Sequence, residues 1–268
     1  MLDARMTWVL ERDVFANGDC IRDAASEAGD RVVEWSDEWW ASSGWPQLDG
    51  PVLFHGSLGN AARIPRVVPW KPGAYCDTAR FYCSTWYPAA AKWLLQQRWE
   101  ILPASRFVRD VEAVMERLEA KESVFVRPDS PLKPFAGRVL RRDQVSLAAL
   151  DHGLYYDDPD LPVVIAPVRQ VAREWRYVVA GGQVVAGSGY IADGRTAAPE
   201  DPNGRPWEFA VEMAQHIRSP DPVYVLDVCE ADTGLRLLEL NPFSGADLYR
   251  CSGADIVRRV AAIVREAV

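Results

Sequence analysis

The sequence predicts an α+β protein, on three observations. A strand candidate at residues 51–55 runs into a Gly-Ser-Leu-Gly turn at residues 56–59, a pattern typical of a strand-to-helix connection. Apolar residues at helical spacing predict an amphipathic helix over residues 110–121. The second half holds two pairs of β-rich runs around tight turns, which predict antiparallel hairpins. We therefore expect an N-terminal α/β domain over residues 1–120 and a second, hairpin-containing domain over residues 121–268.

The composition is that of an ordinary globular protein and excludes several classes. Hydrophobic residues make up 49% and charged residues 25% of the chain, and no apolar run reaches the roughly 18 residues that cross a membrane. The N-terminus lacks a basic start leading into an apolar stretch, so we expect no secretory signal and a cytoplasmic location. A net charge of −8 argues against nucleic acid as a partner, since phosphate backbones require basic surfaces.

The cysteines and histidines do not form a recognisable framework. The five cysteines are an odd number, widely spaced and without a CxxC pair, and the three histidines lie far apart in sequence. This pattern argues against a disulfide scaffold and against a structural zinc site. We expect each cysteine to be a plain thiol.

The first half is rich in tryptophan and in helical segments. We expect a helix over residues 87–100 in addition to the helix over 110–121. The tryptophans are expected in the core rather than in cofactor stacking, because each buries a large apolar area. The turn at residues 56–59 could bind a ligand at a helix N-terminus, but its glycine spacing matches neither the dinucleotide nor the P-loop pattern. Turn geometry is therefore the favoured interpretation of that segment.

The second half is predicted to contain single strands, two hairpins and two helices. Single strands are expected at residues 123–127, 137–141 and 162–168; hairpins at residues 174–190 and 224–240; and helices at residues 207–216 and 254–268. The first hairpin turns at a Gly-Gly pair, and the second turns near residues 232–234.

Two acidic residues interrupt the apolar strands of the second hairpin. Asp227 and Glu239 would lie on adjacent strands, and Asn241 would share the face of Glu239 because strand side chains alternate. An ionised carboxylate in such a place is costly unless a cation or a partner compensates it. Two carboxylates and an amide oxygen are hard ligands that suit Mg²⁺. The alternative is a pair of surface carboxylates on an exposed hairpin.

Cations lie upstream of this hairpin. Arg127 ends a strand, Lys133 follows in a Pro-rich loop, and Arg176 lies in the first hairpin. Triphosphate binding needs donors that reach several phosphate oxygens while Mg²⁺ neutralises the rest. Each cation alone is more often a solvated surface charge; their order relative to the acidic hairpin favours the phosphate-binding interpretation.

These elements, in this order, resemble the ATP-grasp superfamily. The segments that carry the resemblance are Phe-Val-Arg-Pro at residues 125–128, Lys-Pro-Phe-Ala-Gly at 133–137, Glu-Trp-Arg-Tyr at 174–177, Val-Leu-Asp-Val at 225–228 and Leu-Glu-Leu-Asn-Pro-Phe at 238–243. Within the superfamily the chain is most similar to a clade of small ligases marked by one arginine and two lysines. The resemblance covers roughly residues 120–260 and implies an ATP-grasp fold of two α+β subdomains clamping the nucleotide, preceded by a pre-ATP-grasp α/β domain.

The resemblance implies a role for each matching residue. Asp227, Glu239 and Asn241 would hold Mg²⁺, and Lys133 and Arg127 would contact nucleotide phosphates. Arg176 would lie near the γ-phosphate and the acyl-phosphate intermediate, so that Arg176 and Lys133 are the catalytic candidates. The backbone of Ala166, Pro167 and Val168 would read the adenine edge. Position 127 departs from the clade, which usually has lysine there; arginine keeps the charge but has a wider, planar fork.

The implied activity is an ATP- and Mg²⁺-dependent carboxylate–amine ligase that forms an amide or peptide bond through an acyl phosphate. Ser244, Asp247 and Tyr249, just past the hairpin, are candidates for the acceptor side. The implied substrates are a small carboxylate and an amine, such as an amino acid or a peptide, and a homodimer is left open. Two alternatives use the same site: a kinase, and a non-catalytic nucleotide-binding module.

Overall fold

The computed structural model describes residues 5–15, 20–42, 44–150, 158–191, 196–197 and 201–267. The chain divides into two compact units. Unit 1 consists of Met1–Asp77 with Ala172–Val268, and unit 2 of Thr78–Val171. The expected domain boundary at residue 120 falls inside unit 2, between α7 (Val111–Arg117) and β6 (Ser123–Pro128), and remains a prediction.

The N-terminal part of unit 1 is built on a parallel four-stranded sheet in the order β2-β1-β3-β4. Its elements are β1 (Thr7–Leu10), α1 (Cys20–Glu27), β2 (Arg31–Glu34), α2 (Glu38–Ser42), β3 (Val52–His55), α3 (Leu58–Val67) and β4 (Pro72–Gly73). The strand and helix expected around residues 51–59 are therefore present, as β3 and α3. All four residues of β1 and of β3 are buried, so these strands form the centre of the sheet.

The C-terminal part of unit 1 carries a five-stranded sheet in the order β11-β10-β9-β12-β13. Its elements are β9 (Val171–Ala180), β10 (Gln183–Ile191), β11 (Thr196–Ala197), α9 (Arg205–His216), β12 (Val223–Ala231), β13 (Gly234–Pro242), the short 3₁₀ helix η2 (Phe243–Gly245) and α10 (Gly253–Ala267). Both expected hairpins are confirmed, as β9–β10 and β12–β13. The helices expected at 207–216 and 254–268 are present as α9 and α10.

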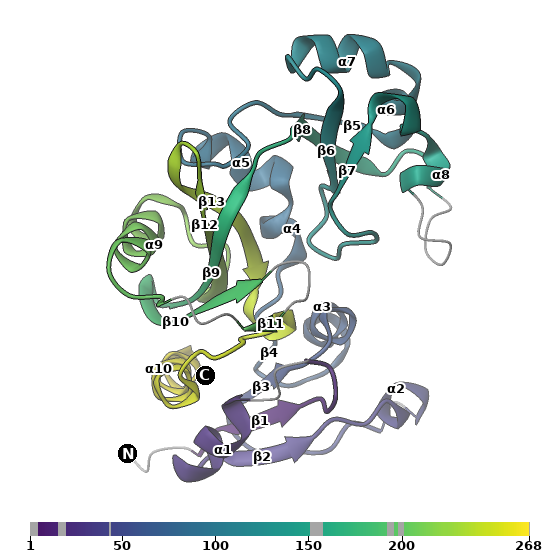
Figure 1. Cartoon of the computed structure of the whole chain (residues 1–268). Helices are drawn as coiled ribbons and strands as arrows, with labels where there is room; N and C mark the ends of the chain where they lie inside the picture. Colours follow the sequence, from purple (N-terminus) through teal and green to yellow (C-terminus); the bar gives the residue numbers. More distant parts are fainter. Residues whose placement is uncertain are drawn as a thin grey trace. The chain divides into compact units, whose positions relative to one another are not determined.

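The two segments of unit 1 share one hydrophobic core. Trp8 and Leu10 of β1 belong to the same buried cluster as Val225 of β12 and Val260 of α10. Helices α1 and α10 pack against each other (Figure 1), although they lie at opposite ends of the chain. The apolar stripe of α10 therefore finds its partner in the N-terminal segment, which explains why these segments form a single unit.

Five tryptophans of the first half form one aromatic cluster in or against the core, where the tryptophans were expected. Trp35 is buried and stands nearly perpendicular to the rings of Trp39 and Phe54, with ring centres 5.2 Å apart in each pair. Trp40, Trp45 and Trp70 complete the group. This aromatic cluster belongs to a second core of unit 1, between the four-stranded sheet and its flanking segments.

Unit 2 is an antiparallel four-stranded sheet in the order β5-β8-β6-β7, with helices beside it (Figure 1). Its elements are α4 (Thr78–Phe81), α5 (Cys83–Ala90), β5 (Glu100–Pro103), α6 (Ala104–Arg109), α7, β6, β7 (Arg138–Arg141), the 3₁₀ helix η1 (Arg142–Gln144), α8 (Leu147–Leu150) and β8 (Pro162–Pro167). Along β6 burial alternates, so Val124 and Val126 enter the core with Phe107 and Met115, whereas Arg127 lies on the other face.

The helix expected over residues 87–100 is wrong beyond Ala90. Helix α5 ends at Ala90, and the chain reaches β5 through turns. Leu94 and Leu95 are buried in that connection, so their apolar character reflects burial in a turn rather than a helical face. Apolar residues at short spacing indicate burial, and burial alone does not distinguish a helix from a packed turn.

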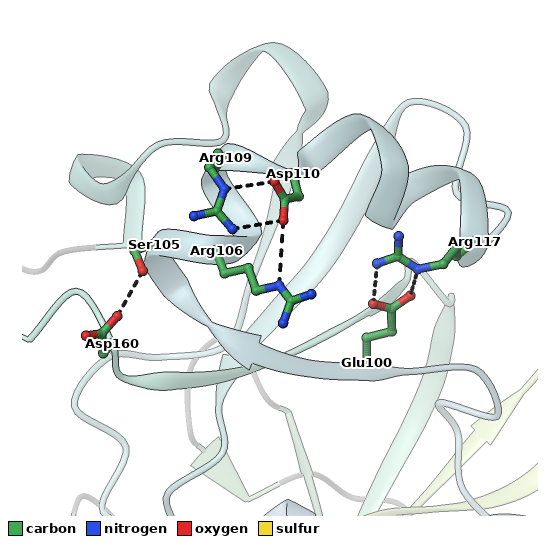
Figure 2. Close-up of polar contacts among 7 residues, drawn as sticks. All are labelled: Glu100, Ser105, Arg106, Arg109, Asp110, Arg117 and Asp160. Carbon is green, nitrogen blue, oxygen red and sulfur yellow. Dashed lines mark hydrogen bonds and ion pairs between the residues drawn. The ribbon is translucent and has the colours of Figure 1, made fainter.

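Exposed ion pairs link α7 to the sheet of unit 2 and close the end of α6. Figure 2 shows Arg117 of α7 donating from Nε and Nη2 to the two carboxylate oxygens of Glu100 on β5, at 2.8 and 2.7 Å. Arg109 and Arg106 both approach Asp110, and the hydrogen bond from Arg109 lowers the pKa of that carboxyl. These pairs are solvated, so they fix local geometry more than they stabilise the fold.

Candidate functional site

The hairpin β12–β13 carries three polar side chains on one face of the sheet. Its register places Asp227 directly opposite Glu239 and Asn241 opposite Val225. The amide nitrogen of Asn241 donates to Oδ2 of Asp227 at 3.0 Å and to Oε2 of Glu239 at 3.1 Å. Asp227 is fully buried, and Glu239 is half-buried. The alternative of an exposed pair of surface carboxylates is therefore wrong for Asp227.

Arg176 joins this group from the neighbouring strand β9. Its Nε donates to Oδ1 of Asp227 at 2.8 Å, and its Nη2 donates to Oδ2 at 2.7 Å. Its Nη1 donates to the backbone oxygen of Asp247 at 2.7 Å. Such two-point pairing fixes the plane of the carboxylate as well as compensating its charge.

The buried pair has a clear electrostatic balance. Burial by itself would lower the pKa of Arg176, but the charge of Asp227 and its hydrogen bonds outweigh that effect and hold the pKa well above the ordinary value. Arg176 therefore stays charged throughout the physiological range. The ion pair occupies the position where the sequence predicted a metal ligand and a phosphate-binding cation.

Aromatic rings and a further carboxylate surround Arg176. The rings of Tyr190 and Tyr249 are stacked at 4.8 Å with an interplanar angle of 7°, and the guanidinium carbon of Arg176 lies 5.4 and 5.1 Å from their centres. Glu174 lies opposite Tyr190 in the β9–β10 register. Burial raises the pKa of Glu174, the hydrogen bond with Tyr190 lowers it in part, and the charges of Asp227 and Glu239 raise it further.

The sequence reasoning did not assign a role to Glu174 or Tyr190. Glu174 stands two residues before Arg176, so strand alternation could have placed it on the same face. Counting from the Gly-Gly turn would place Gly189 opposite Glu174, but a β-bulge between Val184 and Ala186 shifts the register so that Tyr190 takes this place. The sequence therefore carried a signal for Glu174, whereas the position of Tyr190 and the pairing of β9 with β12 follow only from the structure.

The residues that follow the hairpin differ in accessibility. Ser244 is fully buried, and its Oγ accepts a hydrogen bond from the backbone nitrogen of Tyr75 at 2.9 Å. The Asp247 carboxylate accepts from the backbone nitrogen of Tyr249 at 2.9 Å, and Tyr249 adopts a left-handed backbone with φ 51°. Ser244 therefore anchors this segment, whereas Tyr249 is buried beside Arg176 and Asp247 is half-buried.

In unit 2, the Pro-rich loop lies against strand β6. Asp129 anchors its start, accepting from the backbone nitrogen and the hydroxyl of Ser84 at 2.7 Å each. A Cβ added at Gly137 would come within 2.8 Å of the Phe125 ring and 3.5 Å of the Arg127 Cβ, so the end of the loop closely approaches the strand. Lys133 lies between these points with a left-handed backbone, φ 49°.

The predicted adenine-binding segment lies at the end of β8. Ala166 pairs with Phe125 of β6, and Pro167 pairs with Val124. Pro167 and Val168 line a pocket of about 810 Å³ within unit 2, together with Ser123 and Val139. This volume lies in the range of small-molecule sites. Arg127 and the Lys133 loop belong to the same unit, whereas Asp227, Glu239, Asn241 and Arg176 belong to unit 1.

A carboxylate of the protein binds the helix N-terminus that follows the turn at residues 56–59. Helix α3 begins at Leu58, and Ser57 caps it by accepting from the backbone nitrogen of Asn60. Glu11 accepts from the backbone nitrogen of Ser57 at 2.8 Å and from the amide of Asn60 at 3.2 Å. A carboxylate of the protein therefore fills the helix N-terminus, which agrees with the interpretation as turn geometry.

Other metal or thiol chemistry finds no support in the described residues. Within the ranges described above, no three histidine, cysteine, aspartate or glutamate side chains gather as a metal site. The five cysteines are free thiols, and burial raises the pKa of Cys76 and Cys229 to about 12. None of the helices in the described part of the chain is long and apolar enough to span a membrane.

The sequence of this chain matches a family model over most of its length. The model is that of the ATP-grasp domain, R-2K clade family 3, and the match covers residues 66–263. The chain belongs to this ATP-grasp family. The resemblance drawn from the five sequence segments is thereby confirmed at the level of the superfamily and the clade. A search of curated proteins found no match to this ATP-grasp chain.

Solved structures share the fold of this ATP-grasp protein along nearly its whole length. D-cycloserine synthetase DcsG has a TM-score of 0.63 at 14% identity, covering 97% of this chain and 99% of that chain. The ATP-grasp ligase PsnB complexed with minimal precursor has a TM-score of 0.59 at 11% identity, covering 96% and 98%. D-alanyl-alanine synthetase A from Vibrio cholerae has a TM-score of 0.59 at 12% identity, covering 100% and 99%. These similarities confirm the α+β ATP-grasp fold.

Proposed function

We propose that this chain is an ATP- and Mg²⁺-dependent carboxylate–amine ligase that forms an amide or peptide bond. The observation that carries the proposal is the group of Asp227, Glu239, Asn241 and Arg176 on one face of the sheet of an ATP-grasp protein. Support also comes from proteins of the same fold, whose names describe a D-cycloserine synthetase, a D-alanyl-alanine synthetase and an ATP-grasp ligase complexed with a minimal precursor.

The residues of the acidic hairpin fit a magnesium ion in their chemistry. Asp227 and Glu239 offer carboxylate oxygens, and Asn241 offers an amide oxygen once its amide group is turned over. The two carboxylates approach the same amide group, so the three side chains are already gathered. A bound Mg²⁺ would supply charge compensation for the phosphate oxygens. We propose these three residues as its ligands.

The nucleotide contacts are proposed for residues of both units. In unit 2, Arg127 and Lys133 would contact phosphate oxygens, and the backbone of Ala166, Pro167 and Val168 would contact the adenine. The support for the adenine assignment is the family resemblance of this strand; Pro167 and Val168 also line an open surface pocket, whose lining residues do not include Ala166, Arg127 or Lys133. In unit 1, Arg176 retains two N–H donors beyond the three that the protein uses, and these would serve the γ-phosphate.

The chemistry requires no nucleophilic side chain. A substrate carboxylate oxygen attacks the γ-phosphorus, and ADP leaves; an amine nitrogen then attacks the acyl carbon, and phosphate leaves as the amine gives up a proton. The protein contributes alignment of the reactants and fixed positive charge near the transferred phosphoryl group. Tyr249, beside Arg176, is proposed to contact the acceptor. The cytoplasm remains the proposed location, and the small carboxylate and amine remain the proposed partners.

The first test is ATP binding measured by calorimetry, with and without Mg²⁺, on the wild type and on Glu239→Ala. Glu230→Ala is the matched control, since Glu230 is a carboxylate of the same hairpin that pairs with Arg173. We expect Glu239→Ala to weaken Mg²⁺-dependent binding by about tenfold or more, and the control to bind like the wild type. A wild type that binds no ATP under either condition would reject the nucleotide-binding proposal.

A second test separates ligation from simple phosphate transfer. Wild-type protein with ATP, Mg²⁺ and a panel of amino acids is treated with hydroxylamine, which converts an acyl phosphate to a hydroxamate. A ligase gives hydroxamate with hydroxylamine and amide with the correct amine, each with one ADP. ADP release with a stable phosphorylated product would favour the kinase. Nucleotide binding without ADP release from any substrate would favour the non-catalytic module.

A further inference from the structure

The carboxylate of Asp227 is nearly saturated with donors inside the protein. Oδ1 accepts one hydrogen bond from Arg176, and Oδ2 accepts one from Arg176 and one from Asn241. An ionised carboxylate has about four acceptor positions, so these donors use three of them. Asp227 is also fully buried, so water does not supply the remainder. A cation that binds this carboxylate must therefore displace, or approach closely, one of the N–H donors of Arg176 or Asn241.

Arg176 is held in place independently of Asp227. Its Nη1 donates to the backbone oxygen of Asp247, and its side chain is only 9% exposed. The stacked rings of Tyr190 and Tyr249 lie beside the guanidinium. The protein thus supplies a fixed positive charge at Asp227 that does not depend on a flexible surface side chain.

The side chain of Asn241, like that of Arg176, points an N–H donor at Asp227. Its nitrogen, not its oxygen, faces Asp227 and Glu239, and it donates to both. A metal ligand would present the amide oxygen instead. Arg176 and Asn241 therefore both point N–H groups at the Asp227 oxygens that a bound cation would contact.

We infer that Arg176 is a positioning residue that stands in for the metal at Asp227 in the nucleotide-free protein. Its guanidinium compensates the buried carboxylate and keeps it oriented, and Asp227 accepts a divalent cation by exchanging part of that pairing. The inference rests on the proposed function for the identity of the cation. It adds a role in the nucleotide-free protein to the phosphate contact proposed for Arg176.

The test is thermal unfolding of the full chain without nucleotide, in chelator and in excess MgCl₂. The variants are Arg176→Gln, the double variant Arg176→Gln with Asp227→Asn, and Arg173→Gln. The last is the control, because Arg173 lies on the same strand and pairs with Glu230 on the surface, with 58% of its side chain exposed. In chelator, Arg176→Gln leaves a buried carboxylate without its counter-ion, and we expect its Tm to fall by about 10 °C.

The double variant replaces both charges with amides, so we expect it to recover at least half of that loss. In MgCl₂, we expect Arg176→Gln to gain about 5 °C because the cation takes the vacated position. The wild type and the Arg173→Gln control should gain much less. If Arg176→Gln does not fold in chelator, the recovery of a folded double variant supports the inference in the same way.

Two results would overturn the inference. One is a double variant that is no more stable than Arg176→Gln, or that also fails to fold, since Asp227 would then not be the charge that needs compensation. The other is an equal response of wild type and Arg176→Gln to Mg²⁺. Failure of the proposed function looks different: the wild type would bind no ATP in calorimetry, while these metal-dependent shifts without nucleotide would persist.

Discussion

The amide nitrogen of Asn241 lies 3.0 Å from Oδ2 of Asp227, on the opposite strand of the same hairpin. The same nitrogen lies 3.1 Å from Oε2 of Glu239, so one amide group separates two carboxylates that the register places face to face. Like charges directly opposite each other on a sheet destabilise it. Asn241 offsets that repulsion with hydrogen bonds, and its replacement should reveal the effect.

We expect Asn241→Ala to lower the free energy of unfolding by about 1–3 kcal/mol, because two hydrogen bonds to carboxylates are lost. Asn241→Asp should be less stable still in chelator, since it adds a third negative charge. Added Mg²⁺ should restore much of the stability of the aspartate variant and little of that of the alanine variant. Urea unfolding in both conditions measures this. Equal stability of Asn241→Asp and wild type in chelator would contradict it.

Gly253 should tolerate no side chain. A Cβ built there would overlap the backbone oxygen of Cys20, so α10 and α1 would have to separate. We expect Gly253→Ala to destabilise unit 1 by about 3 kcal/mol or more. Gly59→Ala in α3 is the matched control, with no atom within 4 Å of the added group. It should leave stability unchanged or raise it by about 0.5 kcal/mol. Thermal unfolding compares the two variants.

Asp129 should matter to the Lys133 loop beyond its own hydrogen bonds. It is 4% exposed and accepts two hydrogen bonds from Ser84 at the start of α5. We expect Asp129→Ala to cost about 1–3 kcal/mol and to weaken ATP binding by loosening the loop before Lys133. Asp143→Ala, at an exposed pair with Arg141, is the control and should change neither quantity. Urea unfolding and calorimetry supply the measurements; normal ATP affinity in a destabilised Asp129→Ala would reject the effect on the loop.

The raised pKa of Glu174 predicts a pH-dependent stability. Burial is the main cause, so the folded state binds the proton more tightly than the unfolded state does. The favourable contribution of the protonated group is complete below the unfolded pKa and is lost as pH rises through the folded pKa. Glu174→Gln removes this loss, so its free energy of unfolding relative to wild type should be higher at about pH 8 than at about pH 5. Urea unfolding at both values tests this, with Glu230→Gln as the control for losing a charge from the same sheet.

The sequence sufficed for the features that depend on neighbouring segments. The strand β6 with Arg127 and the helix α10 were predictable because each shows its own periodicity. The turn of the hairpin β12–β13, over Asp232 and Thr233, was predictable as well, but counting from it would oppose Asp227 to Leu238. A β-bulge between Asp227 and Val228 shifts the register by one residue and brings Glu239 opposite Asp227. The helix expected over residues 87–100 failed because burial of Leu94 and Leu95 in a turn imitates a helical pattern.

What the sequence by itself determined is therefore the set of chemical groups and the strands that carry them: two carboxylates, an amide and several cations, in the order typical of an ATP-grasp protein. Only the tertiary structure decided that Arg176 pairs with Asp227, 51 residues away, and that the segment before Asp77 shares a core with the segment after Ala172. Contacts of that kind close long loops at an entropic cost that no local pattern records. They form because buried strands and helices stabilise them collectively, and this packing places a fixed guanidinium at the buried carboxylate.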